Sequence, residues 1–250
     1  MSKAADFRER ARNALREKWV IAILVGFVVN LLGGALDVGP KVSLQYNTYG
    51  LEGKVSLAGM TIFSTQTGIG PTRMAFVLGG VTVAMLIGLI FYVLYFALGA
   101  IIEVGYAKFN LNLVDGWEAS FENIFAYFSD WLTMVKAKIL RSLYTFLWGL
   151  LLIIPGVIAS LNYSMTDYIL AEHPELSASE ALRRSKEMMR GNRWRLFCLN
   201  FSFIGWIILF TVTMDIGFLW LRPYMNAATA AFYREISGTE EAAEEAEEWY

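Results

Sequence analysis

The sequence predicts an all-α polytopic membrane protein with about six transmembrane helices arranged as three hairpins. Of its 250 residues, 56% are hydrophobic and only 18% are charged, whereas a soluble globular domain carries about 25% charged residues. A helix needs about 20 predominantly apolar residues to cross the hydrocarbon core of a bilayer. Four stretches without a charged residue approach or exceed this length, which favours membrane spans over a large soluble helical core: residues 19–36, 74–102, 142–166 and 196–214.

The N-terminal half begins with a predicted cytoplasmic amphipathic helix over residues 1–18, followed by a first span over 19–37. No small-residue cleavage site follows the apolar run, so we expect this run to stay as a span rather than act as a signal peptide. In the external loop, residues 38–73, apolar and polar residues alternate on either side of a glycine-rich turn. This pattern predicts an external β-hairpin, with a mobile loop as the alternative. The second span covers residues 74–103.

The third apolar stretch contains Pro155 and Gly156, two residues that interrupt helices. We expect the chain to reverse there, so that residues 136–154 and 155–171 are two spans, preceded by a cytoplasmic or interfacial segment over 104–135. One kinked span is the alternative. The first arm is short for a crossing, so we expect its basic residues to snorkel toward the interface: Lys136, Lys138 and Arg141.

Arginine and lysine are concentrated in two segments, residues 1–18 and 172–194. Such residues stay on the cytoplasmic side when they flank membrane spans. A reversal within the third stretch places both segments in the cytoplasm, whereas a single crossing would place the second one outside. Residues 195–214 then lead outward as a fifth span. The rest of the chain returns inward, as a span or re-entrant segment over 215–235 followed by a cytoplasmic acidic tail over 236–250.

Residues 172–194 predict a basic amphipathic helix along the cytoplasmic leaflet. Ser177 and Glu180 have the spacing of a capping box, and Gly191 fits a helix end. The basic face of this helix would lie near anionic headgroups, unless the helix is merely solvated. Together with the N-terminal helix it supplies the candidate contacts with anionic lipids: Arg12, Arg16, Lys18, Arg183, Arg184, Arg190 and Arg193.

Residue types that support catalysis are scarce in this chain. A single cysteine and a single histidine exclude an intrachain disulfide and a multi-histidine zinc site. We therefore predict no catalytic residue, cofactor or metal, and no nucleic-acid partner. Polar residues in apolar stretches are costly; they either make interhelical hydrogen bonds or line a polar path formed by Asn30, Asn162, Thr166, Asp167, Asp215, Arg222 and Asn226.

The second half of the chain resembles a known family. The resemblance rests on the runs LLLIIPGVIASLNYSM, SASEALRRSKEMMRGNRWRLF, FSFIGW and RPYMNAATAAFY, which are similar to those of a bacterial integral-membrane family called domain of unknown function 975. It extends to the opening arginine-rich helix and Trp19, and it leaves out the external loop. The resemblance implies a protein of the bacterial cytoplasmic membrane and implies no activity.

The expected function is therefore non-enzymatic. We expect an integral protein of the bacterial cytoplasmic membrane that binds lipids or a partner or that acts in assembly. Its expected partners are membrane lipids, anionic ones in particular, and further copies of the chain in a homo-oligomer. The alternative is a transporter or channel with a polar site near Asn162, Thr166 and Asp215, and an intramembrane enzyme is the least favoured class.

Overall fold

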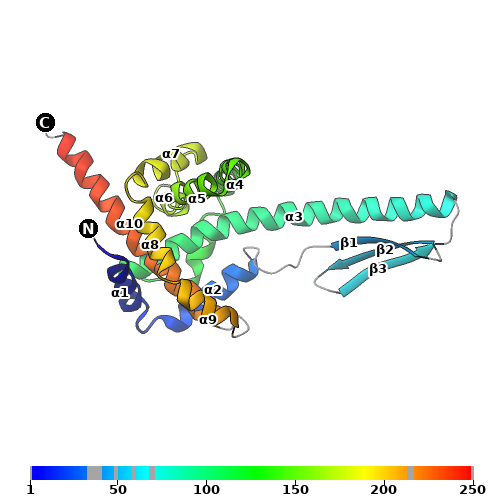
Figure 1. The fold of residues 1–250 in the computed structure, drawn as a ribbon, viewed down its shortest axis with the longest axis horizontal. Helices are drawn as coiled ribbons and strands as arrows, with labels where there is room; N and C mark the ends of the chain where they lie inside the picture. Colours follow the sequence, from blue (N-terminus) through cyan, green and yellow to red (C-terminus); the bar gives the residue numbers. More distant parts are fainter. Residues whose placement is uncertain are drawn as a thin grey trace. The chain divides into compact units, whose positions relative to one another are not determined.

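The computed structural model describes residues 2–32, 41–47, 50–57, 60–67, 71–212 and 217–248. The chain forms two compact units. The first contains Met1–Asn30 and Gly99–Tyr250, and the second contains Leu31–Leu98. The described residues are predominantly helical, in line with the predicted fold class, and the strands are confined to the second unit (Figure 1).

The second unit contains a three-stranded antiparallel sheet in the order β1-β2-β3. Its strands are β1 (Lys41–Asn47), β2 (Gly50–Leu57) and β3 (Met60–Thr67). The pairing of β1 with β2 confirms the predicted hairpin, whose external location stays a prediction. The third strand was not predicted. It adds a second ladder to β2, and a third strand stabilises a sheet that would be marginal with two.

Helix α3 (Pro71–Val114) begins in the second unit and ends in the first. It starts with proline, which lacks a backbone N–H and is favoured in the first helical turn. The helix continues eleven residues past the predicted end of the second span at residue 103. Residues 104–114 contain no proline and one glycine, so nothing in this stretch stops the helix.

The N-terminal segment forms α1 (Ala4–Leu15) and α2 (Trp19–Leu32). Glu17, between the two helices, has a φ of 72°. The apolar side of α1 is buried through Phe7, Ala11 and Leu15, and α1 packs against α10 and α8. The predicted amphipathic helix is thus present over a shorter range, with its apolar face covered by other helices of the same chain, and its cytoplasmic location stays a prediction.

Helices α4 (Trp131–Leu151) and α5 (Ile153–Asn162) form a helical hairpin, which confirms the predicted reversal. The turn lies at Leu152, whose backbone is extended (φ −164°, ψ 154°). Pro155 lies in the first turn of α5, where a backbone N–H has no intrahelical partner to lose. A Cβ on Gly156 would lie 2.8 Å from the Cα of Gly149. Glycine at 156 therefore allows the two arms to approach closely.

The remaining helices of the first unit are short, apart from the last. They are the 3-10 helix η1 (Phe121–Phe125), α6 (Thr166–Glu172), α7 (Ala178–Met188), α8 (Arg193–Phe201), α9 (Ile204–Val212) and α10 (Phe218–Glu248). The predicted span over 155–171 is not one helix, since α5 ends at Asn162 and α6 begins at Thr166. Helix α10 includes Pro223 in its second turn and extends past residue 235, into the predicted tail.

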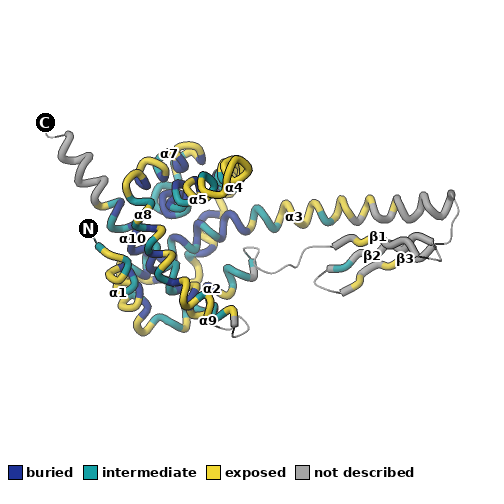
Figure 2. The backbone as a smooth tube through the Cα atoms, in the orientation of Figure 1, coloured by how far each residue is buried: buried dark blue, intermediate teal, exposed yellow. Residues whose placement is uncertain are grey.

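Two helices of the described residues are long and apolar enough to cross a membrane. They are Met85–Val114 and Arg193–Thr211, and a shorter apolar helix covers Trp19–Asn30. Six complete spans are therefore not found by this measure. The core of the first unit contains the centre of α10, where Ala227, Ala228, Ala230 and Ala231 are fully buried (Figure 2). These small side chains let α1, α7 and α8 pack closely against α10.

Candidate functional site

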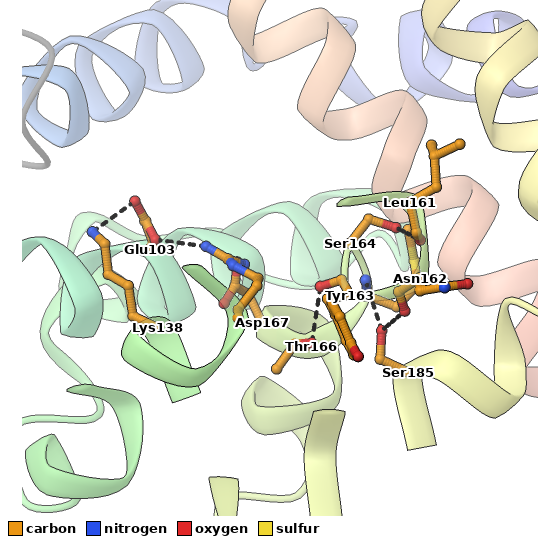
Figure 3. Close-up of polar contacts among 11 residues, drawn as sticks. Glu103, Lys138, Leu161, Asn162, Tyr163, Ser164, Thr166, Asp167 and Ser185 are labelled. Carbon is orange, nitrogen blue, oxygen red and sulfur yellow. Dashed lines mark hydrogen bonds and ion pairs between the residues drawn. The ribbon is translucent and has the colours of Figure 1, made fainter. Parts of the chain in front are cut away.

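Four charged side chains form a quartet that joins α3, α4 and α6 (Figure 3). The Glu103 carboxylate accepts hydrogen bonds from Lys138 Nζ at 3.0 Å and from Arg141 Nη2 at 3.1 Å. Arg141 also pairs with Asp167. The quartet balances two positive and two negative charges. Lys138 and Arg141, which were expected to snorkel, thus pair with carboxylates of the same chain, and their location at a membrane interface stays a prediction.

The break between α5 and α6 is held by one hydroxyl group. Ser185 Oγ on α7 donates to the carbonyl oxygen of Asn162 at 2.8 Å and accepts from the backbone N–H of Met165 at 3.2 Å (Figure 3). Thr166 Oγ1 donates to the Tyr163 carbonyl oxygen at 2.9 Å. The hydroxyls of Thr166 and Ser185 thus satisfy backbone groups that the helix ends expose.

Three further residues of the predicted polar path link α2 to α10. Arg222 donates to the Oδ1 atom of Asn30, and Asn30 Nδ2 donates to the Gly26 carbonyl oxygen at 2.8 Å. Asn226 Nδ2 donates to the Arg222 carbonyl oxygen at 2.8 Å. Among the contacts of the described residues, none joins this group to Asn162. Asp215, which was also predicted to line the polar path, lies outside the described residues.

Residues 232–235 of α10 collect polar contacts from several chain segments, and we call this region the polar junction. The Tyr233 hydroxyl donates to Glu172 at the end of α6 at 2.5 Å. Arg234 pairs with Glu172 and donates from Nε to Asp115 Oδ1, just after α3, at 2.9 Å. Glu235 pairs with Arg195 of α8. The ends of α3 and α6 and the start of α8 therefore meet at one place on α10.

The N-terminus and the loop before α4 reach the same region. The Ser2 backbone N–H donates to Glu235 at 3.2 Å, and the Phe7 ring lies edge-on to Phe232 at 5.3 Å. The Tyr127 hydroxyl donates to the Ala171 carbonyl oxygen at 2.5 Å. Burial, together with the nearby Glu172 carboxylate, raises the pKa of Tyr127 to about 12. Tyr127 therefore remains a hydrogen-bond donor at neutral pH.

A basic groove lies between the N-terminal segment and the end of α3. Its volume is about 510 Å³, and the charged residues that line it are Arg10, Arg16 and Lys18. The other lining residues are Asn13, Ala14, Leu113, Val114 and Gly116. Lys18 Nζ donates to the Trp117 carbonyl oxygen at 3.0 Å, and an Arg10 guanidinium nitrogen lies 3.8 Å from Glu235. The groove thus presents three cations, and Lys18 is held by the loop that follows α3.

The basic helix α7 has the predicted cap and the predicted two faces. The backbone N–H of Glu180 donates to Ser177 Oγ at 3.3 Å, and Ser177 Oγ lies 3.2 Å from the Glu180 carboxylate. The side of α7 that contains Ala181 and Leu182 is buried against α4, α6 and α10. The basic side chains of this helix and of the residues just after it are exposed or half-buried: Arg183, Arg184, Lys186 and Arg190.

The polar junction, the α5–α6 break and the α2–α10 link all include residues from the second half of the chain, where the family resemblance is strongest. Residues 150–240 match the family model described as Protein of unknown function (DUF975). The chain matches no curated protein and no solved structure. The predicted resemblance is thereby confirmed for the matched segment, and its extension to the opening helix stays a prediction.

The DUF975 segment and the basic groove are separate parts of the chain. The segment contains α5 to α9 and most of α10, together with Ser185, Arg222 and residues 232–235 of the polar junction. Every residue that lines the basic groove lies before residue 150. DUF975 residues therefore build much of the helical core, and the earlier part of the chain supplies this groove.

Some of these residues were expected from the sequence and others were not. Arg16 and Lys18 were candidate lipid contacts, and both line the groove. Arg10 and Asn13 were missed, although Asn13 lies three residues from both Arg10 and Arg16, which is the available signal. Arg12, Arg193 and the basic residues of α7 do not line this groove. Ser185 was also missed, and the available signal was a hydroxyl on the apolar side of an amphipathic helix, where a buried polar group needs a hydrogen-bond partner.

Proposed function

We propose that the chain is a multi-pass protein of the bacterial cytoplasmic membrane that binds anionic lipid headgroups in the basic groove. The observation that carries this proposal is the groove of about 510 Å³ lined by Arg10, Arg16 and Lys18. A phosphodiester headgroup presents a negative charge and hydrogen-bond acceptors at its phosphate, which suits guanidinium and ammonium donors. Asn13 adds an amide to the same surface.

The groove adjoins a surface that suits acyl chains. Lys18 is followed directly by Trp19, the first residue of α2, and tryptophan is favoured at membrane interfaces. Val20, Leu24 and Phe27 of α2 are exposed. A lipid with its phosphate in the groove would therefore have apolar side chains beside its tails. A soluble anion would gain nothing from α2, and this difference favours a lipid as the ligand.

The polar junction supports an arrangement in which several helix ends share the cytoplasmic side. It brings together the N-terminus, the end of α3, the end of α6, the start of α8 and residues 232–235 of α10. We propose that α2 and α8–α9 lead away from this side and that α3 and α10 return to it. The groove and the basic helix α7 then lie on the side where arginine and lysine are retained.

Helix α7 has a smaller part in this proposal than the sequence suggested. Its apolar side is already buried by helices of the same chain, so it does not insert that side into lipid. Arg183, Arg184 and Arg190 then act on anionic lipids only through their charge, which contributes about 1 kcal/mol per residue near the surface. The groove adds contact geometry to charge, and we expect it to bind more selectively.

Transport or channel activity has less support than lipid binding. Of the residues predicted to line a polar path, Asp167 pairs with Arg141 and Arg222 pairs with Asn30. These contacts join neighbouring helices and give each side chain a structural partner. The proposal includes no chemical step. The role in assembly that the sequence also suggested would follow if bound lipids brought copies of the chain together.

Native mass spectrometry of the full chain in detergent tests the proposal, with dioleoyl phosphatidylglycerol as anionic probe and dioleoyl phosphatidylcholine as neutral probe. The test variant combines R10Q, R16Q and K18Q, and the matched control combines R183Q, R184Q and R190Q. Three charges at about 1 kcal/mol each set an upper bound of about 100-fold on the loss of phosphatidylglycerol binding. We expect a loss of tenfold or more in the groove variant.

The matched control removes three positive charges from α7 and the residues just after it. It therefore distinguishes binding at a specific site from a general electrostatic attraction. The control should lose at least threefold less than the groove variant, because in detergent no anionic membrane surface is present on which charge alone could act, and phosphatidylcholine binding should not change in either variant. Equal losses in the two variants, or no loss in the groove variant, would show that the groove is not the binding site. Thermal unfolding of both variants checks that they remain folded.

A further inference from the structure

We infer that the α4–α5 hairpin is re-entrant: it enters the membrane from the cytoplasmic side, reaches about the middle of the bilayer and returns to the same side. Its partner is the acyl-chain layer of one leaflet. This inference rests on the proposed membrane location but not on the basic groove. It replaces the two full spans that the sequence predicted over residues 136–154 and 155–171.

Both arms of the hairpin end at the same level. Arg141 of α4 pairs with Asp167 of α6, five residues after the end of the second arm, and both bond within the charged quartet. The chain advances eleven residues from Arg141 to the turn at Leu152, which is about 16 Å at 1.5 Å per residue. The second arm, α5, has 10 residues, or about 15 Å. Each length is about half of a hydrocarbon core of about 30 Å.

The quartet marks the level at which the hairpin leaves the protein. Before it, one side of α4 is covered by other helices: Met134 and Ala137 are its buried residues, and α4 packs against the basic helix α7. After it, the side chains of α4 are exposed or half-buried up to the turn. Four charged groups are far less costly at an interface than at the bilayer centre, so the quartet belongs near the headgroups.

The turn of the hairpin is strongly apolar and strongly exposed. Residues 150–154 are five consecutive leucines and isoleucines, and their exposed fractions range from 68% to 83%, with Ile153 the highest. Water-exposed apolar patches of this kind are uncommon in soluble monomers and mark contact with lipid or a partner. No charged residue occurs from position 142 to position 166, which suits a location at the bilayer centre.

Polarity changes along the hairpin in the order that a leaflet requires. A groove of about 450 Å³ between the two arms is lined by Arg141, Ser142, Thr145, Phe146, Ser160 and Ser164. The charged group and the hydroxyls therefore lie toward the quartet, and only Phe146 lies nearer the turn on α4. The Ser160 and Ser164 hydroxyls donate to carbonyl oxygens three residues earlier, at 3.0 and 2.8 Å, which lowers the cost of placing them in the membrane.

The chain returns because α6 is locked into the core rather than continuing α5. Met165 and Thr166 are buried, and Ser185 bonds both sides of the break. A second full span would instead need a continuous helix through residue 171. The re-entrant path also keeps the basic segments 1–18 and 172–194 on one side of the membrane, as the positive-inside rule requires.

Site-directed spin labelling of the full chain in sealed liposomes tests the inference. In a Cys198→Ser background, single cysteines replace Ile153 at the turn, Phe146 on the arm and Ser142 near the quartet. These side chains are exposed, so labels should not disturb folding. Leu24→Cys on α2 is the control. Power saturation with oxygen and a water-soluble nickel chelate gives each label's depth.

We expect the label at 153 to be the deepest of the three, near the bilayer centre, and depth to decrease through 146 to 142. In intact cells, a membrane-impermeant maleimide added outside should not react with the Ile153→Cys variant. Reaction from outside would show that the hairpin crosses the membrane. A water-accessible label at 153 with a buried label at 24 would show that the hairpin does not insert. Both results overturn the inference.

The same measurements separate this inference from the proposed lipid site. If no variant loses phosphatidylglycerol binding while the labels show the predicted depths, the groove is not the lipid site, but the re-entrant hairpin is still supported. Water-accessible labels at both 153 and 24, in protein that does not float with liposomes, would refute the membrane location itself and the hairpin with it.

Discussion

Replacing Ser185 with alanine should destabilise the protein through the backbone rather than through lost side-chain packing. Ser185 is fully buried, and its hydroxyl bonds the Asn162 carbonyl oxygen at 2.8 Å and the Met165 N–H at 3.2 Å. Alanine leaves both backbone groups without this partner in a buried region. An unsatisfied buried polar group costs about 1–3 kcal/mol. We expect a loss of about 2–4 kcal/mol, because the two groups share one site and partly relax together.

The assay is thermal unfolding in detergent, followed by intrinsic tryptophan fluorescence. For a chain of this size, 1 kcal/mol corresponds to about 2–4 °C in Tm, so Ser185→Ala should lower Tm by about 5–15 °C. The matched control is Ser179→Ala on the exposed side of the same helix, where the change should be within about 0.5 kcal/mol. Equal Tm values for the two variants would refute the bridging role of the Ser185 hydroxyl.

Three further predictions concern close approaches and charge pairs. Gly156→Ala should lower Tm, because its Cβ would lie 2.8 Å from the Cα of Gly149. In the control Gly149→Ala, the new Cβ has nothing within 4 Å, so this variant should be neutral or more stable by up to about 1 kcal/mol. Equal changes in Tm for the two variants would contradict the close contact. Arg141→Gln and Asp167→Asn should each lower the free energy of unfolding by about 1–3 kcal/mol, since both side chains are less than a third exposed. In a double-mutant cycle, the double variant should lose less stability than the sum of the two single variants, and additive losses would argue against the ion pair. Gly105→Ala should fail to fold or should melt far below the parent chain, because its Cβ would overlap a backbone carbonyl group of η1; a stable, monodisperse variant would show that α3 and η1 do not meet there.

Local sequence rules predicted the features that depend on neighbouring residues. The predicted cap at Ser177 is present, because a cap needs only residues three positions apart. The buried face of α1 was predicted from a 3.6-residue period. The reversal near Pro155 was also predicted, although the turn lies at Leu152, because proline is accommodated inside the first turn of the returning helix.

Features that depend on distant residues were not predictable from the sequence. The α5–α6 break lies in an apolar stretch and is held by Ser185, which is 20 and 23 residues away from the groups it bonds. Lys138 and Arg141 pair with Glu103 at separations of 35 and 38 residues. Because these partners are remote in sequence, Lys138 and Arg141 could be interpreted only as cations that snorkel from a predicted span.

The ion pairs of the polar junction constrain where unpaired charges can lie in the described part of the chain. Inside the DUF975 segment, Glu172, Arg195, Arg234 and Glu235 are paired with one another or with neighbouring helices. These pairs join helix ends and are not free to recruit lipid. The groove differs because Arg16, in the connection between α1 and α2, lines an open surface directly before an apolar helix. The paired charges of the matched segment therefore serve the fold, and the proposed lipid selectivity would depend on the α1–α2 connection outside it.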